Sequence, residues 1–294
     1  MAALPPEVLA RLRPLRLHTR RGSAAHGHGS HASVQRGSGL EFAQYRAYEP
    51  GDDPRQVDWK LFARSDRYFV REAERESPLV AWVVVDASAS MGQTDQAQPH
   101  VSRLDIARRV AAGALQLALQ GGDRFGVLAF NQQDLHAIPA GNGARHRDRC
   151  LLALEAVQPA GRWPDTQRMA ASWELLAPRS LVLLLSDCFD DAAVEMAEKL
   201  AVAGRDVCIV QVLMADERDF PYRGGYLFVD TEDASSLLGN AEALRDDYLK
   251  RFAQARAALR ARCTRAGIML AAQFADDAID AALQQLFGMQ GRGR

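Results

Sequence analysis

One run of residues limits the possible folds of this chain more than any other. Residues 79–85 (Leu-Val-Ala-Trp-Val-Val-Val) are apolar on both sides of an extended strand. Such a strand belongs in the middle of a parallel sheet that is covered on both faces. Three later runs have the same character: 125–130, 181–185 and 207–213. The sequence therefore predicts a buried, mostly parallel sheet.

Helical patterns separate these strands. Residues 104–119 carry apolar side chains at the spacing of one buried helix face. Further segments read in the same way: a short helix within 4–17, an edge strand at 135–138, helices at 146–157, 166–177, 192–203, 241–266 and 277–287, and a last strand at 268–274. Alternating strands and helices predict right-handed crossovers and a doubly wound, three-layer α/β fold.

The first third of the chain differs in texture, and we expect two parts. Residues 1–77 form an extension and residues 78–290 form the main α/β domain. The extension begins with a basic arm, which has six arginines and one acid in its first 40 residues. Such an arm is either simply solvated or docks on an acidic partner. His26, His28 and His31 lie among glycines, without a nearby Cys or carboxylate, which argues against a metal site there.

The second half of the extension is rich in turns, aromatic residues and charges. The stretch Pro50-Gly51-Asp52-Asp53-Pro54 predicts a turn, although Asp52 and Asp53 leave open a second acidic site. Trp59 is either a packing or a recognition residue. We expect a small, irregular or β-rich module in this region.

Bulk properties exclude some classes of protein. The net charge of −1 argues against a nucleic-acid binder. Arginines interrupt any N-terminal apolar segment, and the longest apolar runs are too short to span a membrane. The four cysteines are widely spaced, as is typical of reduced thiols. We therefore expect a cytoplasmic protein.

The chemistry should lie beyond the carboxyl ends of the strands, where open parallel sheets bind ligands. Asp86-Ala-Ser88-Ala-Ser90 follows the first strand, and Ser186-Asp187 follows the third. Carboxylate and hydroxyl oxygens are hard ligands that suit Mg²⁺ or Mn²⁺. The alternative is that Asp86 and the serines cap the following helix. The strand-end context favours the metal site.

These residues carry a resemblance. The segment from Val83 to Met91 resembles the first part of the metal-ion-dependent adhesion site of von Willebrand factor A domains, and Leu181–Asp187 resembles the part that supplies its distal aspartate. The resemblance implies a metal site of Asp86, Ser88, Ser90, Thr166 and Asp187. Thr166 is the weakest match, because the usual Gly-Gly before this threonine is absent.

A second resemblance is longer. Arg46-x-Tyr48-x-Pro50-Gly51-Asp52-Asp53-x-Arg55, followed by Val57-Asp58-Trp59, is similar to the signature of the bacterial domain-of-unknown-function family 58 (DUF58). With the flanking motifs, the similarity covers roughly residues 20–215. Members are commonly encoded beside MoxR-type AAA+ ATPases. The resemblance therefore implies an adaptor or co-chaperone in protein maturation or remodelling.

Three functions follow as hypotheses. The first is a non-enzymatic binding module whose metal ion contacts an Asp or Glu of a protein partner. The second is a structural scaffold with an empty metal site. The third is a Mg²⁺-dependent phosphotransferase or hydrolase that uses Asp86. A haloacid-dehalogenase-type site would need an acid two residues later, where Ser88 stands, and no phosphate-binding loop or zinc motif occurs.

Overall fold

The computed structural model describes residues 4–19, 42–49, 57–73, 79–164, 172–229 and 236–288. The chain divides into two compact units, one formed by Met1–His26 with Leu79–Arg294 and the other by Gly27–Pro78. Each unit is described by itself below.

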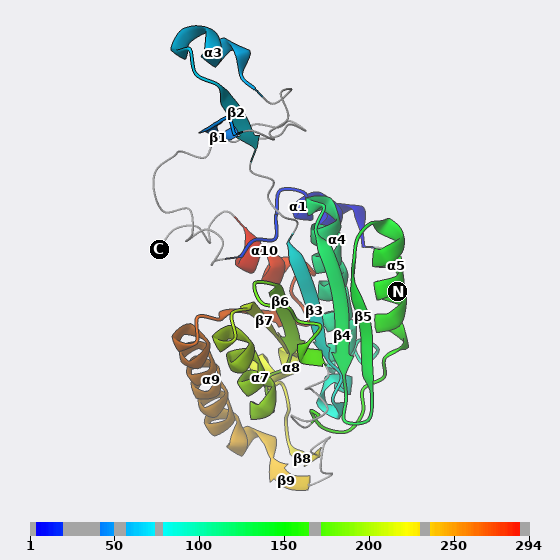
Figure 1. The fold of residues 1–294 in the computed structure, drawn as a ribbon. Coiled ribbons are helices and arrows are strands. Elements are labelled where there is room, and N and C mark those ends of the chain that lie inside the picture. Colours follow the sequence, from blue (N-terminus) through cyan, green and yellow to red (C-terminus); the bar gives the residue numbers. More distant parts are fainter. Residues whose placement is uncertain are drawn as a thin grey trace. The chain divides into compact units, whose positions relative to one another are not determined.

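The larger unit contains a six-stranded sheet (Figure 1). Its strands, in spatial order, are β10 (Met269–Phe274), β7 (Asp206–Leu213), β6 (Leu181–Ser186), β3 (Val80–Asp86), β4 (Arg124–Phe130) and β5 (Leu135–Gly141). All neighbouring pairs are parallel except β4 and β5. The mostly parallel, doubly wound α/β fold predicted from the sequence is confirmed.

Helices cover both faces of this sheet (Figure 1). One face packs on α1 (Pro6–Leu12), α4 (Arg103–Gly121), α5 (Ala144–Ala156) and α10 (Ala281–Phe287), and the other on α7 (Asp191–Val202) and α9 (Ala241–Arg265). In β3, Val83 and Val85 face the first layer, whereas Trp82 and Val84 face the second. Burying a side chain of this kind stabilises the fold by roughly 1.5–3 kcal/mol, which explains why the strands are apolar on both sides.

The start of α4 matters for the site. Ser102 and Asp105 form a capping box, in which the Ser102 hydroxyl accepts from the Asp105 N–H and the Asp105 carboxylate accepts from the Ser102 N–H. Such boxes satisfy the free N–H groups of a first helical turn. The cap fixes Arg103 as the first residue of α4, directly after the loop that leaves β3.

Some segments of the larger unit differ from the expectation. Residues 1–77 are expected to form an extension, but Val8 and Leu12 of α1 are buried in the main core, and Arg11 bonds to Asp280 at 2.6–3.0 Å. Three short elements after β7 were not predicted: α8 (Ala215–Asp219) and the hairpin of β8 (Gly225–Val229) and β9 (Ser236–Asn240). The first half of the helix expected at 166–177 lies outside the described residues, and in the second half residues 172–173 are helical and a turn follows.

The smaller unit contains an antiparallel pair of strands, β1 (Phe42–Ala47) and β2 (Phe69–Ala73), with α3 (Trp59–Ser65) between them in sequence. Asp58 caps α3 by accepting from the N–H groups of Lys60 and Leu61. Trp59 contacts Phe62 and Tyr68 edge-on but stays 59% exposed. The predicted turn at 50–54 and the three histidines of the arm lie outside the described residues.

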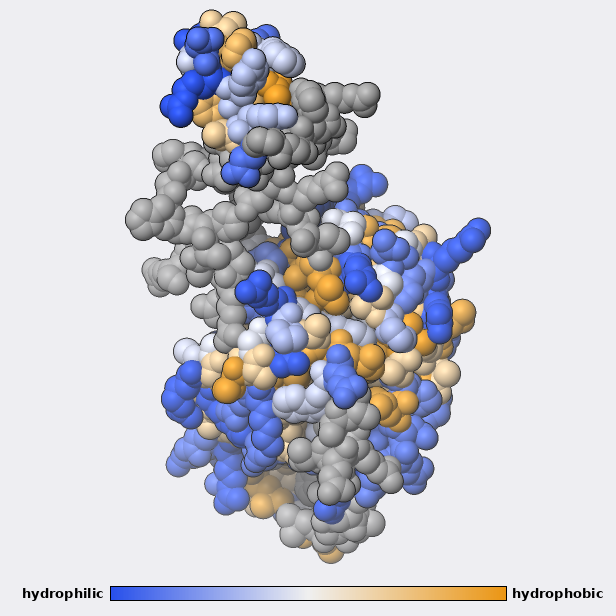
Figure 2. Space-filling model, viewed as in Figure 1, coloured by the Kyte–Doolittle hydropathy of each residue, from blue (hydrophilic) through white to orange (hydrophobic). Residues whose placement is uncertain are grey.

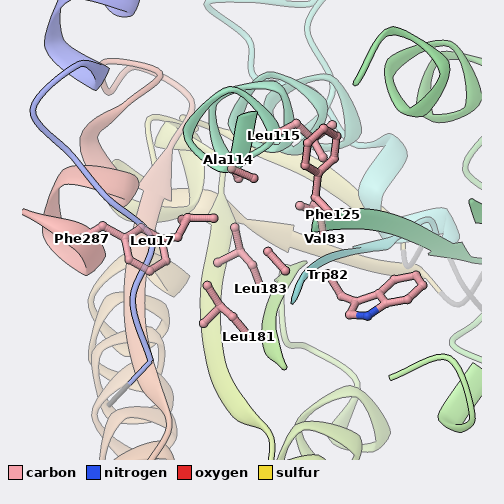
Figure 3. Close-up of a pocket in the computed structure, with 11 residues that line it drawn as sticks. Leu17, Trp82, Val83, Ala114, Leu115, Phe125, Leu181, Leu183 and Phe287 are labelled. Atoms are coloured by element: carbon pink, nitrogen blue, oxygen red, sulfur yellow. The ribbon is translucent and has the colours of Figure 1, made fainter. Parts of the chain in front are cut away.

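A small cavity lies inside the main core, between β3, β6 and α4, with Leu17 and Phe287 beside it (Figure 3). Its volume is about 10 Å³, and apolar side chains line it. A space of this size holds at most one water, and a water needs polar partners. We therefore interpret it as imperfect packing and not as a ligand site.

The surface view shows apolar residues in small groups among charged ones on this face of the larger unit (Figure 2). Of the helices in the described ranges, none is long and apolar enough to cross a membrane. The four cysteines are free thiols in the structure, and Cys150, Cys208 and Cys263 are buried.

Candidate metal centre at the carboxyl edge of the sheet

Asp86 is the last residue of β3 and is almost fully buried, at 1% exposure. One carboxylate oxygen accepts from the Ser88 N–H at 2.8 Å, and the other accepts from the Ser186 hydroxyl at 2.6 Å. Ser186 ends the neighbouring strand β6, so two strand ends meet at this carboxylate. Burial, and then the charge of Asp187, raises the pKa of Asp86 to about 7. Among the described residues, the hydrogen-bond partners of this buried carboxylate are therefore all neutral groups.

Ser88 and Ser90 lie next to Asp86 in the loop after β3. Both are buried, and their hydroxyl oxygens are 3.1 Å apart. The loop is anchored by the buried side chain of Met91 and by a 2.7 Å bond from the Ala89 N–H to the Gly161 carbonyl. The three predicted residues of this loop are therefore brought together.

Asp187 follows β6 and is also buried, at 2% exposure. One of its carboxylate oxygens accepts from the Phe189 N–H at 3.0 Å, and the other accepts from the Arg103 guanidinium at 2.9 Å. Its backbone carbonyl accepts from the Gln211 side chain at 3.1 Å. Asp187 therefore lies at the same sheet edge as Asp86, as predicted, but with a cationic partner.

Arg103 was not identified from the sequence. Its side chain is fully buried, and one guanidinium nitrogen donates to both Asp187 and the Ser90 carbonyl, at 2.9 and 2.8 Å. The other terminal nitrogen bonds to the carboxylate of Glu217 in α8 and to Gln93. In the part of the chain that the structure describes, its Nε has no hydrogen-bond partner. The exposed ring of Phe189 lies 5.0 Å from the guanidinium, within the range of a cation–π contact.

The charges in this cluster do not balance. Asp86, Asp187 and Glu217 are three acids with little solvent contact, and Arg103 is the cation that contacts two of them. Burial also raises the pKa of Glu217. Buried charge is costly unless it is compensated. With all three acids ionised the cluster has two excess negative charges, which one divalent cation would neutralise.

The donor atoms fit Mg²⁺ or Mn²⁺. Two adjacent ligands of an octahedral ion with bonds of about 2.1 Å lie about 3.0 Å apart, close to the 3.1 Å between the two hydroxyls. In the described part of the chain, no cluster of three or more His, Cys, Asp or Glu side chains could hold a metal ion. A metal here would therefore depend on the serine hydroxyls. Thr166 lies outside the described residues, so its role stays a prediction.

A cavity of about 230 Å³ opens at the same edge of the sheet. It is lined by Phe130, Asn131, Gln133, Asp134, Leu135 and Pro164. It adjoins the loop after β3, because the Ala87 N–H donates to the Phe130 carbonyl at 2.7 Å. The edge of the sheet thus combines a polar centre with a hollow large enough for a side chain.

Several known proteins are similar to this chain. The chain is 30% identical over 256 residues to the uncharacterized proteins Mb1516 of Mycobacterium bovis and Rv1480 of Mycobacterium tuberculosis, which covers 86% of this chain and 80% of each relative. Similar solved structures include the conserved hypothetical protein BatB from Bacteroides thetaiotaomicron, at 15% identity and a TM-score of 0.44 over 71% of this chain and 95% of BatB.

Another similar structure is an aerotolerance-related membrane protein from Bacteroides fragilis, at 17% identity and a TM-score of 0.39, with 64% of this chain and 98% of that protein covered. The family model described as "protein of unknown function DUF58" matches residues 44–258, which is most of the chain. The protein therefore belongs to the DUF58 family.

Proposed function

We propose that this protein is a non-enzymatic protein-binding module with a metal-ion-dependent adhesion-type site. The site would hold Mg²⁺ or Mn²⁺ through Asp86, Ser88, Ser90, Thr166 and Asp187. One observation carries the proposal: two buried hydroxyls lie 3.1 Å apart beside Asp86, a buried carboxylate that has only neutral hydrogen-bond partners.

The donor set indicates what such a site would do. Ser88 and Ser90 are neutral ligands, so a bound ion would keep much of its positive charge. When bound, the ion supplies a Lewis-acidic position that attracts an outside carboxylate. An Asp or Glu of a protein partner suits this position, and the exposed ring of Phe189 beside the site offers apolar contact area.

The partner is proposed from the family. We propose a MoxR-type AAA+ ATPase, or a client of one, with this protein acting as a cytoplasmic adaptor or co-chaperone. DUF58 membership supports this choice. The net charge of −1 supports a protein partner over a nucleic acid.

The enzyme hypothesis has less support. Both carboxylate oxygens of Asp86 already accept hydrogen bonds, from the Ser88 N–H and the Ser186 hydroxyl, which hold the carboxylate in place. A nucleophile needs a neighbouring acid or base, and the residue two positions later is Ser88.

The scaffold hypothesis is favoured by one specific observation. Arg103 already supplies a positive charge to Asp187, so the fold has an internal counter-charge without a metal. The first experiment must therefore separate a binding site from an empty one.

That experiment is thermal unfolding with and without Mg²⁺ or Mn²⁺, in the wild type and in Asp86→Ala. We expect the ions to raise the Tm of the wild type and to leave the Tm of Asp86→Ala unchanged. An equal response in both proteins would show that the ions act elsewhere and would exclude this site.

Partner binding is tested by capture of the MoxR-type ATPase with Ser88→Ala, in Mg²⁺ and in EDTA. The matched control is Ser180→Ala, which removes a buried hydroxyl before the amino end of β6, far along the strand from the site. We expect EDTA and Ser88→Ala to weaken capture and Ser180→Ala to leave it intact. Equal capture by all three proteins in both buffers would exclude a metal-dependent contact.

A further inference from the structure

We propose that Arg103 is a built-in competitor of the metal ion, which lowers the affinity of the site for divalent cations. The guanidinium and the ion would share Asp187 as their counter-charge. This inference rests on the proposed function and adds to it a residue that sets the strength of metal binding.

The Arg103 guanidinium lies against residues that are proposed to hold the ion. One nitrogen of Arg103 donates to the Asp187 carboxylate and to the Ser90 carbonyl, at 2.9 and 2.8 Å. The guanidinium therefore contacts two of the residues proposed to hold the ion. A full positive charge therefore lies one hydrogen bond away from each of these two residues.

The side chains of Arg103 and Asp187 are both buried, with exposed fractions of 0% and 2%. Two positive charges a few ångströms apart repel strongly where water does not screen them. An ion bound beside Ser90 would meet this repulsion in full, and it would also compete for the negative charge of Asp187.

The guanidinium has a second acidic partner. Its other terminal nitrogen pairs with Glu217, which is held in turn by the Met214 N–H at 2.8 Å. Arg103 can thus keep an acidic partner when Asp187 serves the ion. Its Nε has no hydrogen bond, so the present arrangement does not use every donor of the side chain. The geometry therefore favours an Arg103 guanidinium that releases Asp187 to the ion and stays paired with Glu217.

The test is Mn²⁺ binding by calorimetry to the full chain, in the wild type and in Arg103→Met, a residue of similar length that carries no charge. We expect the Kd to fall at least about tenfold in Arg103→Met. The control is Arg109→Met, on the exposed side of the same helix. This variant should bind Mn²⁺ with the Kd of the wild type. An equal or higher Kd in Arg103→Met would overturn the inference.

Arg103→Met leaves two acids without their cation and can fail to fold, so the comparison is repeated in a second background. Glu217→Gln removes one of these acids, and we expect it to raise the Kd about tenfold. Adding Arg103→Met to Glu217→Gln should lower the Kd again by a similar factor. A double variant that binds no better than Glu217→Gln would overturn the inference.

Asp86→Ala separates the two proposals. Binding that is lost in Asp86→Ala but unchanged in Arg103→Met overturns only the role of Arg103. Binding that Asp86→Ala does not change, or no binding in any variant, overturns the metal site and the role of Arg103 together.

Discussion

Asp86 and Asp187 lie at the carboxyl ends of the adjacent strands β3 and β6, Asp86 as the last residue of its strand and Asp187 one residue after its strand, and they are buried to 1% and 2% exposure. Their partners differ. Asp86 accepts from a backbone N–H and a serine hydroxyl, whereas Asp187 accepts from a backbone N–H and the Arg103 guanidinium.

This difference separates two tasks that a buried carboxylate can perform. Paired with a buried arginine, Asp187 links α4 to the end of β6 and has a cationic partner within the fold, which it shares with Glu217. Bonded only to neutral groups, Asp86 keeps an unbalanced charge, and its raised pKa of about 7 expresses the cost. A cation from solution would therefore gain more from Asp86 than from Asp187.

The largest effect should come from removing the cation of Asp187. In EDTA, we expect Arg103→Met to lower the free energy of unfolding by about 3–5 kcal/mol, because breaking a buried ion pair leaves an uncompensated charge. Urea denaturation measures this change. Arg109→Met, on the exposed side of α4, should stay within about 0.5 kcal/mol of the wild type. If the two variants were equally stable, Asp187 would not depend on its arginine.

A smaller effect should come from loading and emptying the site at Asp86. At an ion concentration of about 100 times the Kd, Mg²⁺ should stabilise the wild type by about 2.7 kcal/mol. EDTA should remove this gain, and so should Asp86→Asn. The control Asp190→Asn removes a nearby carboxylate but retains a residue that can cap α7, so it should keep the gain. Loss of the gain in the control as well would point to a general charge effect.

Asp280, outside the site, is another buried carboxylate with an arginine as its partner. It is buried, and its hydrogen bond with Arg11 holds its pKa below the usual value of 3.8. The pair therefore contributes stability above about pH 4, and the contribution is lost as the pH falls through the lowered pKa. We expect Arg11→Met to lower the Tm by a few degrees at pH 7 and by less below pH 4.

Thermal unfolding across this pH range measures the difference, with Arg13→Met in the same segment as the exposed control. A difference between Arg11→Met and the wild type that grew as the pH fell would contradict the assignment.

The smallest effect on stability should come from Phe189, which lies over Arg103 but is 53% exposed. We expect Phe189→Ala to change the free energy of unfolding by less than about 0.5 kcal/mol and to leave the Mg²⁺-induced shift in Tm intact. Partner capture should weaken severalfold, because exposed aromatic residues are common anchors of interfaces. Unchanged capture would remove Phe189 from the proposed interface.

The sequence predicted the part of the site that belongs to local chain geometry. The apolar run before Asp86 identified a buried strand, and the spacing of Ser88 and Ser90 placed both hydroxyls in the loop at its end. Asp187 followed from the same reasoning applied to β6. The positions of these residues could be predicted because a buried strand and the turn after it are encoded by neighbouring residues.

The charge balance of the site could not be predicted in the same way. Arg103 lies 84 residues before Asp187 and 114 before Glu217 in the chain, and α8, which carries Glu217, was not expected at all. In the sequence, Arg103 is only a basic residue at the start of a helix. Arg103 is buried because α4, the end of β6 and α8 pack together in the folded chain.

The sequence by itself thus determined a doubly wound α/β chain with carboxylate and hydroxyl side chains at one sheet edge, because strand and helix periodicities are local. The tertiary structure alone decided that Asp187 has a cation as a partner, whereas Asp86 has none among the described residues. The physical reason is that an ion pair forms between groups that packing brings within about 4 Å, whatever their separation along the chain.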